Sequence, residues 1–453
     1  MNWNIVLVWA GWTWMSALAW ILSDLWYWDN IICLDSQKSE LTDKLEKKWL
    51  KVIIWKNIYK PDLFDHIIYS EACANTPEVQ TAKQYERTPK QWRFIGNYFQ
   101  FLWEISKYFS TIWVAGTNWK SSTTAMLIYS AKKHIKNLWI WIVWALVPDL
   151  NWNNYFINPD KQIEIKNVFD HIFTWKWLDY NLIKKNYFII ESCEYKRHFL
   201  ILDTDRWAIT NIELDHTDYY KDLQDYTSAF VERSSRIKNQ VISTEKLDIP
   251  WIKQIETKKF WFKKIFGEHN NKNWSLVFEL IKSIQPQTDD KELIDTIENF
   301  WGLRRRMEYL KTTEKWTIVF SDYWHMASSI QVCYEALKQQ FPDKKLIAIF
   351  QPHQINRVLR ERNEFGKALK KFDSTYIYNI YAARENLEEQ LNNFRHLNIE
   401  NANNIDDLWN IFATNCNWKY ITDINEIKKI IDNWTDNEII TIFSAGDIDY
   451  QIR

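Results

Sequence analysis

The chain has 453 residues and a formal net charge of −1 at pH 7, from 57 Lys and Arg against 58 Asp and Glu. This length predicts roughly two to four domains, and the balanced charge argues against a protein that binds nucleic acid by electrostatic attraction. The five cysteines show no paired spacing, which favours a reducing, cytoplasmic compartment.

Tryptophan is unusually frequent and glycine unusually rare, with 29 Trp and 7 Gly in the chain. Proteins contain about 7% glycine on average, which is roughly 32 residues at this length. Many of the tryptophans stand where a turn or a phosphate loop needs glycine. We hypothesise that most of them are glycine in the natural polypeptide, encoded by UGA codons that another genetic code reads as tryptophan. A protein that is truly rich in tryptophan is the alternative.

Residues 1–60 have the pattern of βαβ units. An apolar strand at residues 5–8 enters the turn Trp9-Ala10-Gly11-Trp12-Thr13-Trp14, which becomes a G-x-G-x-x-G sequence if its tryptophans are glycine. A helix is expected from Met15, and a second strand ends at Asp35, about 20 residues after the turn. The turn predicts a bound nucleotide diphosphate. Asp35 on a ribose would indicate NAD, and another nucleotide diphosphate is the alternative.

The weakly charged run at residues 5–22 could be mistaken for a signal peptide or a membrane helix. It lacks a basic flank, so we interpret it as a buried strand, a turn and a helix. A third strand, at residues 65–68, ends in a loop that carries Ser70. Loops at strand ends line the ligand crevice of an α/β sheet.

Residues 112–124 have the pattern of a phosphate loop. An apolar strand runs into Gly116-Thr117-Asn118-Trp119-Lys120-Ser121-Ser122 and then into a helical pattern. In such a loop, backbone N–H groups and a helix N-terminus face the phosphates. Lys120 would reach the β- and γ-phosphates of ATP, and the Ser121 hydroxyl would hold Mg²⁺. Residue 119 should be small because the backbone approaches phosphate there, and the indole of Trp119 would fill that space.

Two further strands end in groups that can hold a metal. The strand at residues 186–190 ends in Glu191, and the strand at residues 207–211 leads to His216. A carboxylate at the carboxyl edge of a parallel sheet can hold Mg²⁺ beside the phosphates. Surface acids and a structural histidine are the alternatives. Beside the phosphate loop, we predict Ser121, Glu191 and His216 as the metal ligands.

The second half of the chain adds nucleotide-contacting candidates and a third strand series. A polar turn opens a helix with His269, Asn270 and Asn273, of which the two asparagines share a face. Three arginines, residues 304–306, follow Gly302. Such a run is usually a solvated surface, but near ATP it could stabilise transition-state charge. Strands at residues 317–320, 346–350, 375–379 and 439–443 each end in a polar or small-residue loop, which predicts a further α/β domain.

In collinear order, these motifs resemble those of the Mur ligase superfamily over nearly the whole chain. With Trp taken as Gly, residues 12–19 resemble its N-terminal glycine-loop signature and residues 116–120 its ATP loop. Thr210-Asn211-Ile212-Glu213 with Asp215-His216 resembles the central signature. The C-terminal signatures are matched by Gly302 with Arg305-Arg306, by Asp322-Tyr323 with His325, and by Phe350-Gln351-Pro352-His353 with Arg357. The last two are specific to the alanine-adding branch and its close relatives.

Four positions depart from the alanine-adding branch. Asn118 stands where that branch has His, and Cys193 where the family has an acidic residue. Met326 follows His325 in place of a second His, and Gln354 replaces an Arg. These positions lie near the expected amino-acid pocket, so they leave the identity of the added amino acid open without affecting the ATP chemistry.

The strand series and the resemblance together imply a three-domain α/β protein. We expect a Rossmann-like UDP-binding domain at residues 1–107, a central P-loop ATPase-like parallel-sheet domain at 108–311, and a Rossmann-like amino-acid-binding domain at 312–453. The resemblance implies that ATP, with Mg²⁺, phosphorylates the lactyl carboxylate of UDP-N-acetylmuramate and that the amine of L-alanine attacks the acyl phosphate. The implied residues are Lys120, His216, Arg306 and Asp322 for catalysis, residues 116–122 with His269, Asn270 and Asn273 for ATP, Gly11, Trp12, Thr13, Trp14, Met15 and Ser70 for the UDP substrate, and Tyr323, His325 and Arg357 for the amino acid.

Other functions stay open at this point. A recycling ligase that attaches a tripeptide to UDP-N-acetylmuramate shares most motifs and differs in its amine substrate. A nicotinamide-dependent dehydrogenase would use the first domain, but the ATP-type loop at residues 116–121 argues against it. A precursor-binding protein that has lost catalysis is a further alternative, which gains weight if Trp119 is real. We expect a cytoplasmic monomer or homodimer that binds neither nucleic acid nor membrane.

Overall fold

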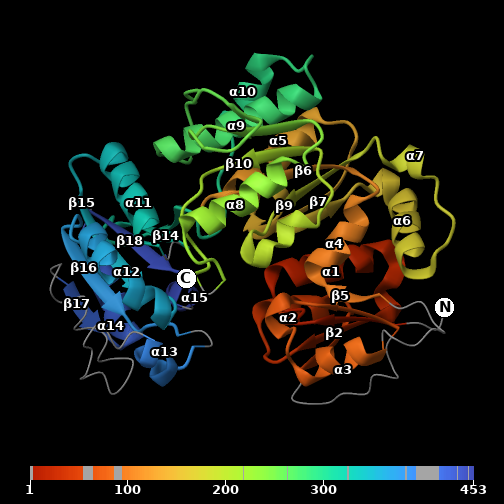
Figure 1. Cartoon of the computed structure of the whole chain (residues 1–453). Coiled ribbons are helices and arrows are strands. Elements are labelled where there is room, and N and C mark those ends of the chain that lie inside the picture. Colours follow the sequence, from red (N-terminus) through yellow and green to blue (C-terminus); the bar gives the residue numbers. More distant parts are fainter. Residues whose placement is uncertain are drawn as a thin grey trace. The chain divides into compact units, whose positions relative to one another are not determined.

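The computed structural model describes residues 4–54, 65–85, 94–217, 219–262, 264–323, 326–382, 385–393, 418–435, 437–446 and 448–453. Its strands form three separate sheets of five, seven and six strands, with helices between the strands (Figure 1). The α/β class predicted from the sequence, with three sheets that are mainly parallel, is therefore confirmed.

The first sheet has the order β3-β2-β1-β4-β5 and is parallel throughout. The strand order reverses at β1, and the loops after β1 and β4 therefore flank the crevice in which such sheets bind ligands. β1 and β4 are buried along their whole length, as expected for apolar strands inside a parallel sheet. The elements are β1 Ile5–Val8, α1 Thr13–Leu22, β2 Ile31–Asp35, α2 Glu40–Lys47, β3 Lys51–Ile54, β4 His66–Tyr69, α3 Pro77–Tyr85, β5 Ile95–Asn97 and α4 Tyr98–Ser106.

The second sheet has the order β12-β11-β10-β6-β9-β7-β8, and within it only β7 and β8 pair antiparallel among the described strands. One hydrophobic core contains side chains from both the first and the second sheet. The elements are β6 Ser110–Ala115, α5 Lys120–His134, β7 Leu138–Val147, β8 Asn153–Ile157, α6 Gln162–Thr174, α7 Tyr180–Ile183, β9 Tyr187–Glu191, β10 Arg206–Ile209, α8 Leu223–Ser234, β11 Gln240–Ser243, β12 Ile252–Gln254, α9 Glu268–Ile284 and α10 Asp290–Glu298.

The third sheet has the order β13-β14-β18-β15-β16-β17, with β13 as an antiparallel edge strand. Its central strands, β15 and β18, are almost wholly buried. The elements are β13 Glu308–Thr312, β14 Ile318–Asp322, α11 Ala327–Gln340, β15 Lys345–Gln351, α12 Ile355–Leu369, β16 Ser374–Tyr378, α13 Leu387–Asn393, β17 Trp418–Ile421, α14 Ile424–Asn433, β18 Glu438–Ser444 and α15 Ile448–Ile452.

The chain divides into two compact units, residues 1–261 with 272–300 and residues 262–271 with 301–453. The first unit holds the first two sheets and the second unit holds the third. The domain boundaries expected near residues 107 and 311 stay predictions.

The weakly charged N-terminal run forms a strand, a turn and a helix, as the sequence predicts. Residues 5–8 are β1 and residues 13–22 are α1. In the ranges that the structure describes, no helix is both long and apolar enough to cross a bilayer.

Candidate active site

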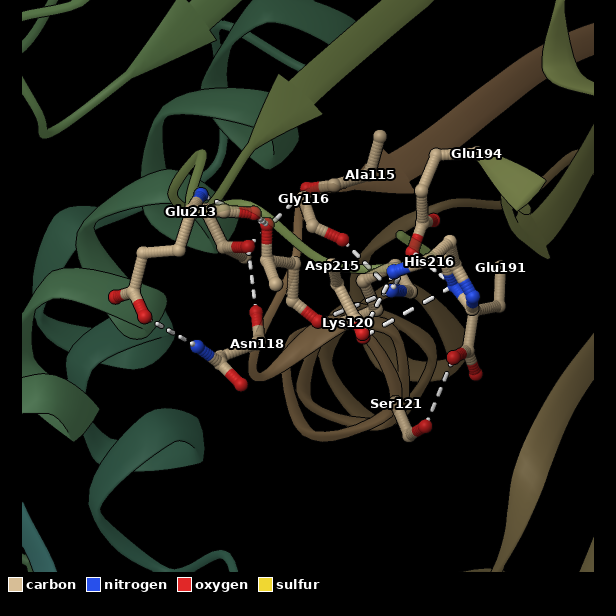
Figure 2. A network of polar contacts seen from close by, with 12 residues as sticks. Ala115, Gly116, Asn118, Lys120, Ser121, Glu191, Glu194, Glu213, Asp215 and His216 are labelled. Carbon is tan, nitrogen blue, oxygen red and sulfur yellow. Dashed lines mark hydrogen bonds and ion pairs between the residues drawn. The ribbon is translucent and has the colours of Figure 1, made fainter. Parts of the chain in front are cut away.

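Three adjacent parallel strands, in the order β10-β6-β9, carry the candidate active site at their carboxyl ends. β6 leads into the loop at residues 116–119 and then α5, β9 ends at Glu191, and β10 leads into residues 210–216. Figure 2 shows side chains from all three segments gathered around Lys120. Groups predicted from separate strands of the sequence thus lie at one edge of one sheet.

Gly116 and Thr210 hold the loop after β6 in a tight turn. Gly116 has φ of 135°, and a Cβ there would lie 2.0 Å from Oγ1 of Thr210, so glycine is required. Thr210 Oγ1 donates to the carbonyl oxygen of Asn118 at 2.7 Å. Thr117 Oγ1 donates to the carbonyl oxygen of Glu213 at 2.7 Å and accepts the N–H of Glu213 at 2.9 Å. The segment after β10 therefore fixes the loop.

Helix α5 begins directly after this loop, and no described side chain caps its first turn. The N–H groups of a first helical turn have no acceptor within the helix, so those of Lys120, Ser121 and Ser122 are available to an anion. Trp119, which precedes the helix, has a left-handed backbone with φ of 63°. The backbone thus has the form of a phosphate site, with an indole where the backbone should approach the ligand.

Three acceptors hold the ammonium of Lys120. Its Nζ donates to the carbonyl oxygens of Gly116 at 2.7 Å and Thr117 at 3.1 Å, and to Oε1 of Glu194 at 2.8 Å. The side chains of Lys120 and Glu194 are only 13% and 2% exposed. A buried charge needs a partner, so each of these groups keeps the other ionised.

The charges of this cluster follow from burial and proximity. Burial alone raises the pKa of the Glu194 carboxyl, but Lys120 and His216 together hold that pKa below its usual value. Burial lowers the pKa of His216, yet its hydrogen bond to Glu194 and the charge of Asp215 leave the pKa raised. Nε2 of His216 lies 3.4 Å from Oε1 of Glu194. One buried carboxylate therefore lies between two cationic groups.

Ser121 and Glu191 supply oxygen donors beside this cluster. Ser121 Oγ donates to Oε1 of Glu191 at 2.8 Å (Figure 2). The Trp144 N–H donates to Oε2 of Glu191 at 3.1 Å. Oε2 of Glu194 is buried and accepts no hydrogen bond from the described residues. The same residues contain no cluster of three His, Cys, Asp or Glu side chains suited to a metal. Because Mg²⁺ is usually bound by one or two carboxylates together with substrate phosphates, these oxygen donors fit that ion.

The turn after β1 is closed by Asp35 and filled by indoles. The Gly11 N–H donates to Oδ2 of Asp35 at 2.8 Å, and a Cβ on Gly11 would lie 2.8 Å from the same oxygen. The ring of Trp12 stacks on that of Trp9 at a centroid distance of 5.6 Å and meets the Trp14 ring at 4.5 Å. Of the other residues predicted for the UDP substrate, Thr13 begins α1, and Met15 and Ser70 are buried.

In the second unit, predicted residues gather at the carboxyl ends of β14 and β18, which are adjacent and parallel. Asp322 ends β14 and is fully buried. The Arg305 guanidinium lies 4.8 Å from the Tyr323 ring centroid and donates to the carbonyl oxygen of Gly446 at 3.1 Å. The Arg306 guanidinium lies 5.1 Å from the same ring.

Residues after β15 join this group of side chains. Arg357 is buried in α12, and His353 stacks on Tyr381 with ring centroids 5.7 Å apart. Burial, with the charges of Arg357 and Arg305, lowers the pKa of His353 to about 4, so its imidazole is neutral at pH 7. Guanidinium groups around a neutral imidazole suit a carboxylate ligand. The predicted His325 lies outside the described residues.

Helix α9 carries the three side chains predicted to contact the nucleotide. His269, Asn270 and Asn273 lie in its first two turns. Asn270 Nδ2 donates to the carbonyl oxygen of Phe266 at 2.7 Å, and Asn273 is buried. The division between the two compact units falls between Asn271 and Lys272, inside this helix.

Two residues of these sites are absent from the set predicted from the sequence. Glu194 is the buried partner of Lys120, and Arg305 binds backbone oxygens at the end of β18. A buried lysine needs a counter-charge when no ligand is present. This requirement is the signal that could have identified an acidic residue near the loop. Arg305 belongs to the signature Gly302 with Arg305-Arg306, but the sequence does not assign it the contact with the end of β18.

Family comparisons cover both units of the chain. Residues 114–298 match the family described as Mur ligase middle domain, and residues 305–446 match the family described as Mur ligase, glutamate ligase domain. A UDP-N-acetylmuramate–L-alanine ligase of Clostridium botulinum (strain Okra / Type B1) is 29% identical, over 96% of this chain and 93% of the relative.

Solved structures of low sequence identity share the fold. A UDP-N-acetylmuramate–alanine ligase from Thermotoga maritima has a TM-score of 0.71 at 20% identity, covering 99% of this chain and 97% of the other. A murein peptide ligase from Psychrobacter arcticus 273-4 has a TM-score of 0.61 at 17% identity, covering 99% and 98% of the two chains. Both similarities extend over all three sheets.

Proposed function

This chain belongs to the Mur ligase family, and we propose that it is an ATP-dependent ligase that joins L-alanine to UDP-N-acetylmuramate in peptidoglycan precursor synthesis. The observation that carries the proposal is the cluster of Lys120, Ser121, Glu191, Glu194 and His216 at the ends of three parallel strands. The curated relative of that activity, similar over 96% of this chain, supports alanine as the amine.

ATP would bind with its phosphates on the loop at residues 116–119 and on the first N–H groups of α5. Lys120 would donate to a phosphate oxygen in place of the two loop carbonyls, while Glu194 keeps its ammonium over the loop. Phosphoryl transfer depends on positioning and charge neutralisation more than on covalent chemistry by the protein. Arg306 would add positive charge, and His269, Asn270 and Asn273 would contact the nucleotide.

Ser121 and Glu191 would hold Mg²⁺, with His216 as the third predicted ligand. When bound, the ion neutralises charge on the transferred phosphoryl group. Ser121 Oγ and the Glu191 carboxylate lie 2.8 Å apart, so both can contribute oxygen to one ion that also contacts phosphate. His216 lies against Glu194 and so also orients the carboxylate that holds Lys120.

UDP-N-acetylmuramate would bind at the turn after β1 and at Ser70. Its lactyl carboxylate accepts the γ-phosphoryl group of ATP, and the resulting acyl phosphate is attacked by the amine of L-alanine. The tetrahedral intermediate collapses to the amide and releases phosphate. Tyr323, His325 and Arg357 would hold the amino acid, because a guanidinium binds a carboxylate with two hydrogen bonds. Asp322, at the end of β14, is proposed as a further catalytic residue beside them.

Several coarser features belong to the same proposal. We assign residues 1–107 to the UDP substrate, 108–311 to ATP and 312–453 to the amino acid. We also propose a cytoplasmic protein that acts as a monomer or homodimer on small-molecule substrates, without a nucleic-acid or membrane partner.

Phosphate release with UDP-N-acetylmuramate, ATP, Mg²⁺ and a panel of amines tests the proposal. The protein used should carry glycine at residues 9, 12, 14 and 119. We expect release that requires both the UDP substrate and L-alanine. Release with a murein tripeptide but not with L-alanine would identify the recycling ligase instead. Binding of both nucleotides without release for any amine would identify a precursor-binding protein.

A further inference from the structure

Eight tryptophans of the described chain adopt a left-handed backbone, with φ from 57° to 68°. Fifteen described non-glycine residues have positive φ, and eight of them are Trp. Only three described glycines have positive φ. Trp makes up 29 of 453 residues, so about one of these fifteen would be Trp if residue type and conformation were unrelated. L-residues with bulky side chains are outliers in this region. The eight are Trp9, Trp26, Trp49, Trp119, Trp152, Trp175, Trp251 and Trp316.

We propose that glycine occupies these eight positions in the natural polypeptide and that both phosphate loops are functional only in that form. The identity of the residues does not depend on the ligase activity proposed above, because it follows from backbone conformation.

Trp49 and Trp175 end helices in the way that glycine does. After α2, the Trp49 N–H donates to the carbonyl oxygen of Glu46 at 2.9 Å and the Leu50 N–H to that of Leu45 at 3.2 Å. This pair of bonds is a Schellman motif, whose left-handed residue is usually glycine. After α6, the Trp175 N–H donates to the carbonyl oxygen of His171 at 2.9 Å, with φ of 57°. That single bond is the simpler left-handed helix ending, which also favours glycine.

Trp251 stands at the glycine position of a type II turn. The Ile252 N–H donates to the carbonyl oxygen of Ile249 at 3.5 Å, which places Pro250 and Trp251 at the two central positions. Trp251 has φ of 62°. A type II turn takes proline at its first central position and needs positive φ, hence glycine, at its second.

Trp152 and Trp316 lie in the two antiparallel connections. Between β13 and β14, the Trp316 N–H donates to the carbonyl oxygen of Thr313 at 2.9 Å, and Trp316 has φ of 68°. A turn followed by a left-handed residue is the hairpin form that takes glycine. Between β7 and β8, Asn151 and Trp152 have φ of 57° and 60°. Consecutive positive φ values are typical of an Asn-Gly pair.

The exposure of these side chains agrees with glycine rather than with a tryptophan-rich binding surface. Trp49 is 90% exposed, and Trp251 and Trp316 are each 74% exposed. They follow α2, β11 and β13, which belong to three different sheets and their helices. Scattered exposed indoles have no packing role, whereas a glycine at each site satisfies the turn.

Buried tryptophans carry a second sign of the same substitution. The indole N–H groups of Trp113, Trp141 and Trp207 are buried and donate to no described atom. Trp113 and Trp207 lie opposite one another in β6 and β10. Buried donors in native proteins almost always have acceptors, so three such indoles in one sheet are anomalous.

Two of the other three positions, Trp9 and Trp119, are in the proposed phosphate loops, and the third is Trp26 at φ of 64°. Trp9 has φ of 66° in the turn after β1, where its N–H donates to the carbonyl oxygen of Leu34 at 2.7 Å. Trp119 has φ of 63° and directly precedes α5. Both are positions where the backbone must come close to a phosphate, which a side chain prevents. One codon translated as glycine in the source and as tryptophan in the printed sequence explains all eight.

Tandem mass spectrometry of the natural protein, isolated from the cells that make it, decides the question. Trypsin releases the peptide from Tyr108 to Lys120, which contains residue 119, and a fragment ion series assigns that residue directly. We expect glycine at residue 119 and at the seven other positions. Tryptophan at residue 119 or at residue 49 would overturn the proposal, whatever the enzyme's activity.

A pair of variants in the recombinant protein tests the conformational argument separately. Both W49G and W49A remove the exposed indole, but only W49G removes the Cβ that disfavours positive φ. We expect W49G to have a Tm about 2 °C above that of W49A. Equal Tm values would show that this turn tolerates a side chain and would overturn the inference from backbone conformation.

Discussion

The ammonium of Lys120 lies 2.8 Å from the carboxylate of Glu194, and both side chains are nearly inaccessible to solvent. His216 approaches the same carboxylate oxygen at 3.4 Å. Glu194 thus positions the phosphate-loop lysine when no phosphate is bound. The lysine has two separable effects, one on phosphate transfer and one on the stability of a buried charge.

Replacing Lys120 with Ala should abolish ADP formation, because the charge that stabilises the transferring phosphoryl group is lost, at a cost of roughly 3 kcal/mol or more. It should also destabilise the protein by about 3 kcal/mol, because the buried Glu194 carboxylate loses its nearer cation and keeps only His216. The double variant K120A/E194Q should regain stability but not activity. Turnover of K120A within a few-fold of the parent would refute the ATP site.

Glu191 should control the dependence on Mg²⁺. Because its carboxylate accepts the Ser121 hydroxyl and is directed toward the loop, E191Q should raise the Mg²⁺ concentration for half-maximal phosphate release by about tenfold or more. E232Q is the matched control, because Glu232 lies on α8 and forms an exposed ion pair with Arg236. An unchanged Mg²⁺ requirement in E191Q would remove Glu191 from the metal site.

Central strands were easier to predict from the sequence than edge strands. β6, β9 and β10 are apolar runs bounded by small or polar residues, so their pattern is visible without a structure. β12 and β13 are short, partly exposed edges without such a run. The hairpin of β7 and β8 is hidden because Trp139, Trp141 and Trp144 turn β7 into one long apolar stretch.

The sequence predicted which segments meet at the site, but not which side chains bind one another there. That groups after β6, β9 and β10 meet at one edge follows from parallel topology. Which carboxylate pairs with Lys120 depends on interatomic distances. Glu194 accepts a hydrogen bond from Lys120 Nζ, whereas Glu191 accepts one from the Ser121 hydroxyl. Backbone conformation, invisible in a sequence, then identifies eight tryptophans at positions that favour glycine.

Glu71 should make stability depend on pH in the acid range. It accepts from Asn97 Nδ2 at 2.9 Å and Lys196 Nζ at 3.1 Å, and lies 3.6 Å from Nε2 of His198. Burial alone raises the pKa of Glu71, but His198, Lys196 and Asn97 outweigh it and hold the pKa at about 2. The folded state therefore binds this proton less readily than the unfolded state does.

A depressed carboxyl pKa stabilises the fold above the unfolded value of about 4.3, and the stabilisation is lost as pH falls from there toward about 2. We expect E71Q to reduce the free energy of unfolding by about 1–2 kcal/mol at pH 7, after solvent screening, and to have no such effect near pH 2. E104Q, in an i,i+3 pair with Lys107, is the control. Denaturant titrations at several pH values measure both. A pH-independent effect of E71Q would contradict the shifted pKa.

Arg357 should set the affinity for the amino acid. It is buried in α12, and its charge contributes to keeping His353 neutral. R357A should raise KM for L-alanine by about tenfold or more, corresponding to about 1.4 kcal/mol or more of lost carboxylate binding. KM for ATP should stay unchanged. R362A, on the same helix, is the control. An equal rise in both KM values would place Arg357 outside the amino-acid pocket.

The two phosphate loops should respond separately to glycine substitution. In the turn after β1, Trp12 lies between Trp9 and Trp14, and Trp14 also meets Trp144 at a ring-centroid distance of 5.5 Å. These rings occupy the turn in which a diphosphate would contact the backbone, and glycine has no side chain to exclude it. The protein with all its printed tryptophans should therefore bind neither nucleotide.

W9G/W12G/W14G should restore binding of UDP-N-acetylmuramate by about tenfold or more without improving ATP binding, because the substituted residues lie in the turn after β1 and at the start of α1. W119G should do the reverse, since residue 119 precedes α5 in the other loop. Each variant is thus the control for the other. Isothermal titration of both nucleotides against the parent, the two variants and their combination measures the eight affinities. Tight binding of both nucleotides by the printed sequence would show that the indoles leave the loops open, and a requirement for glycine there would no longer stand.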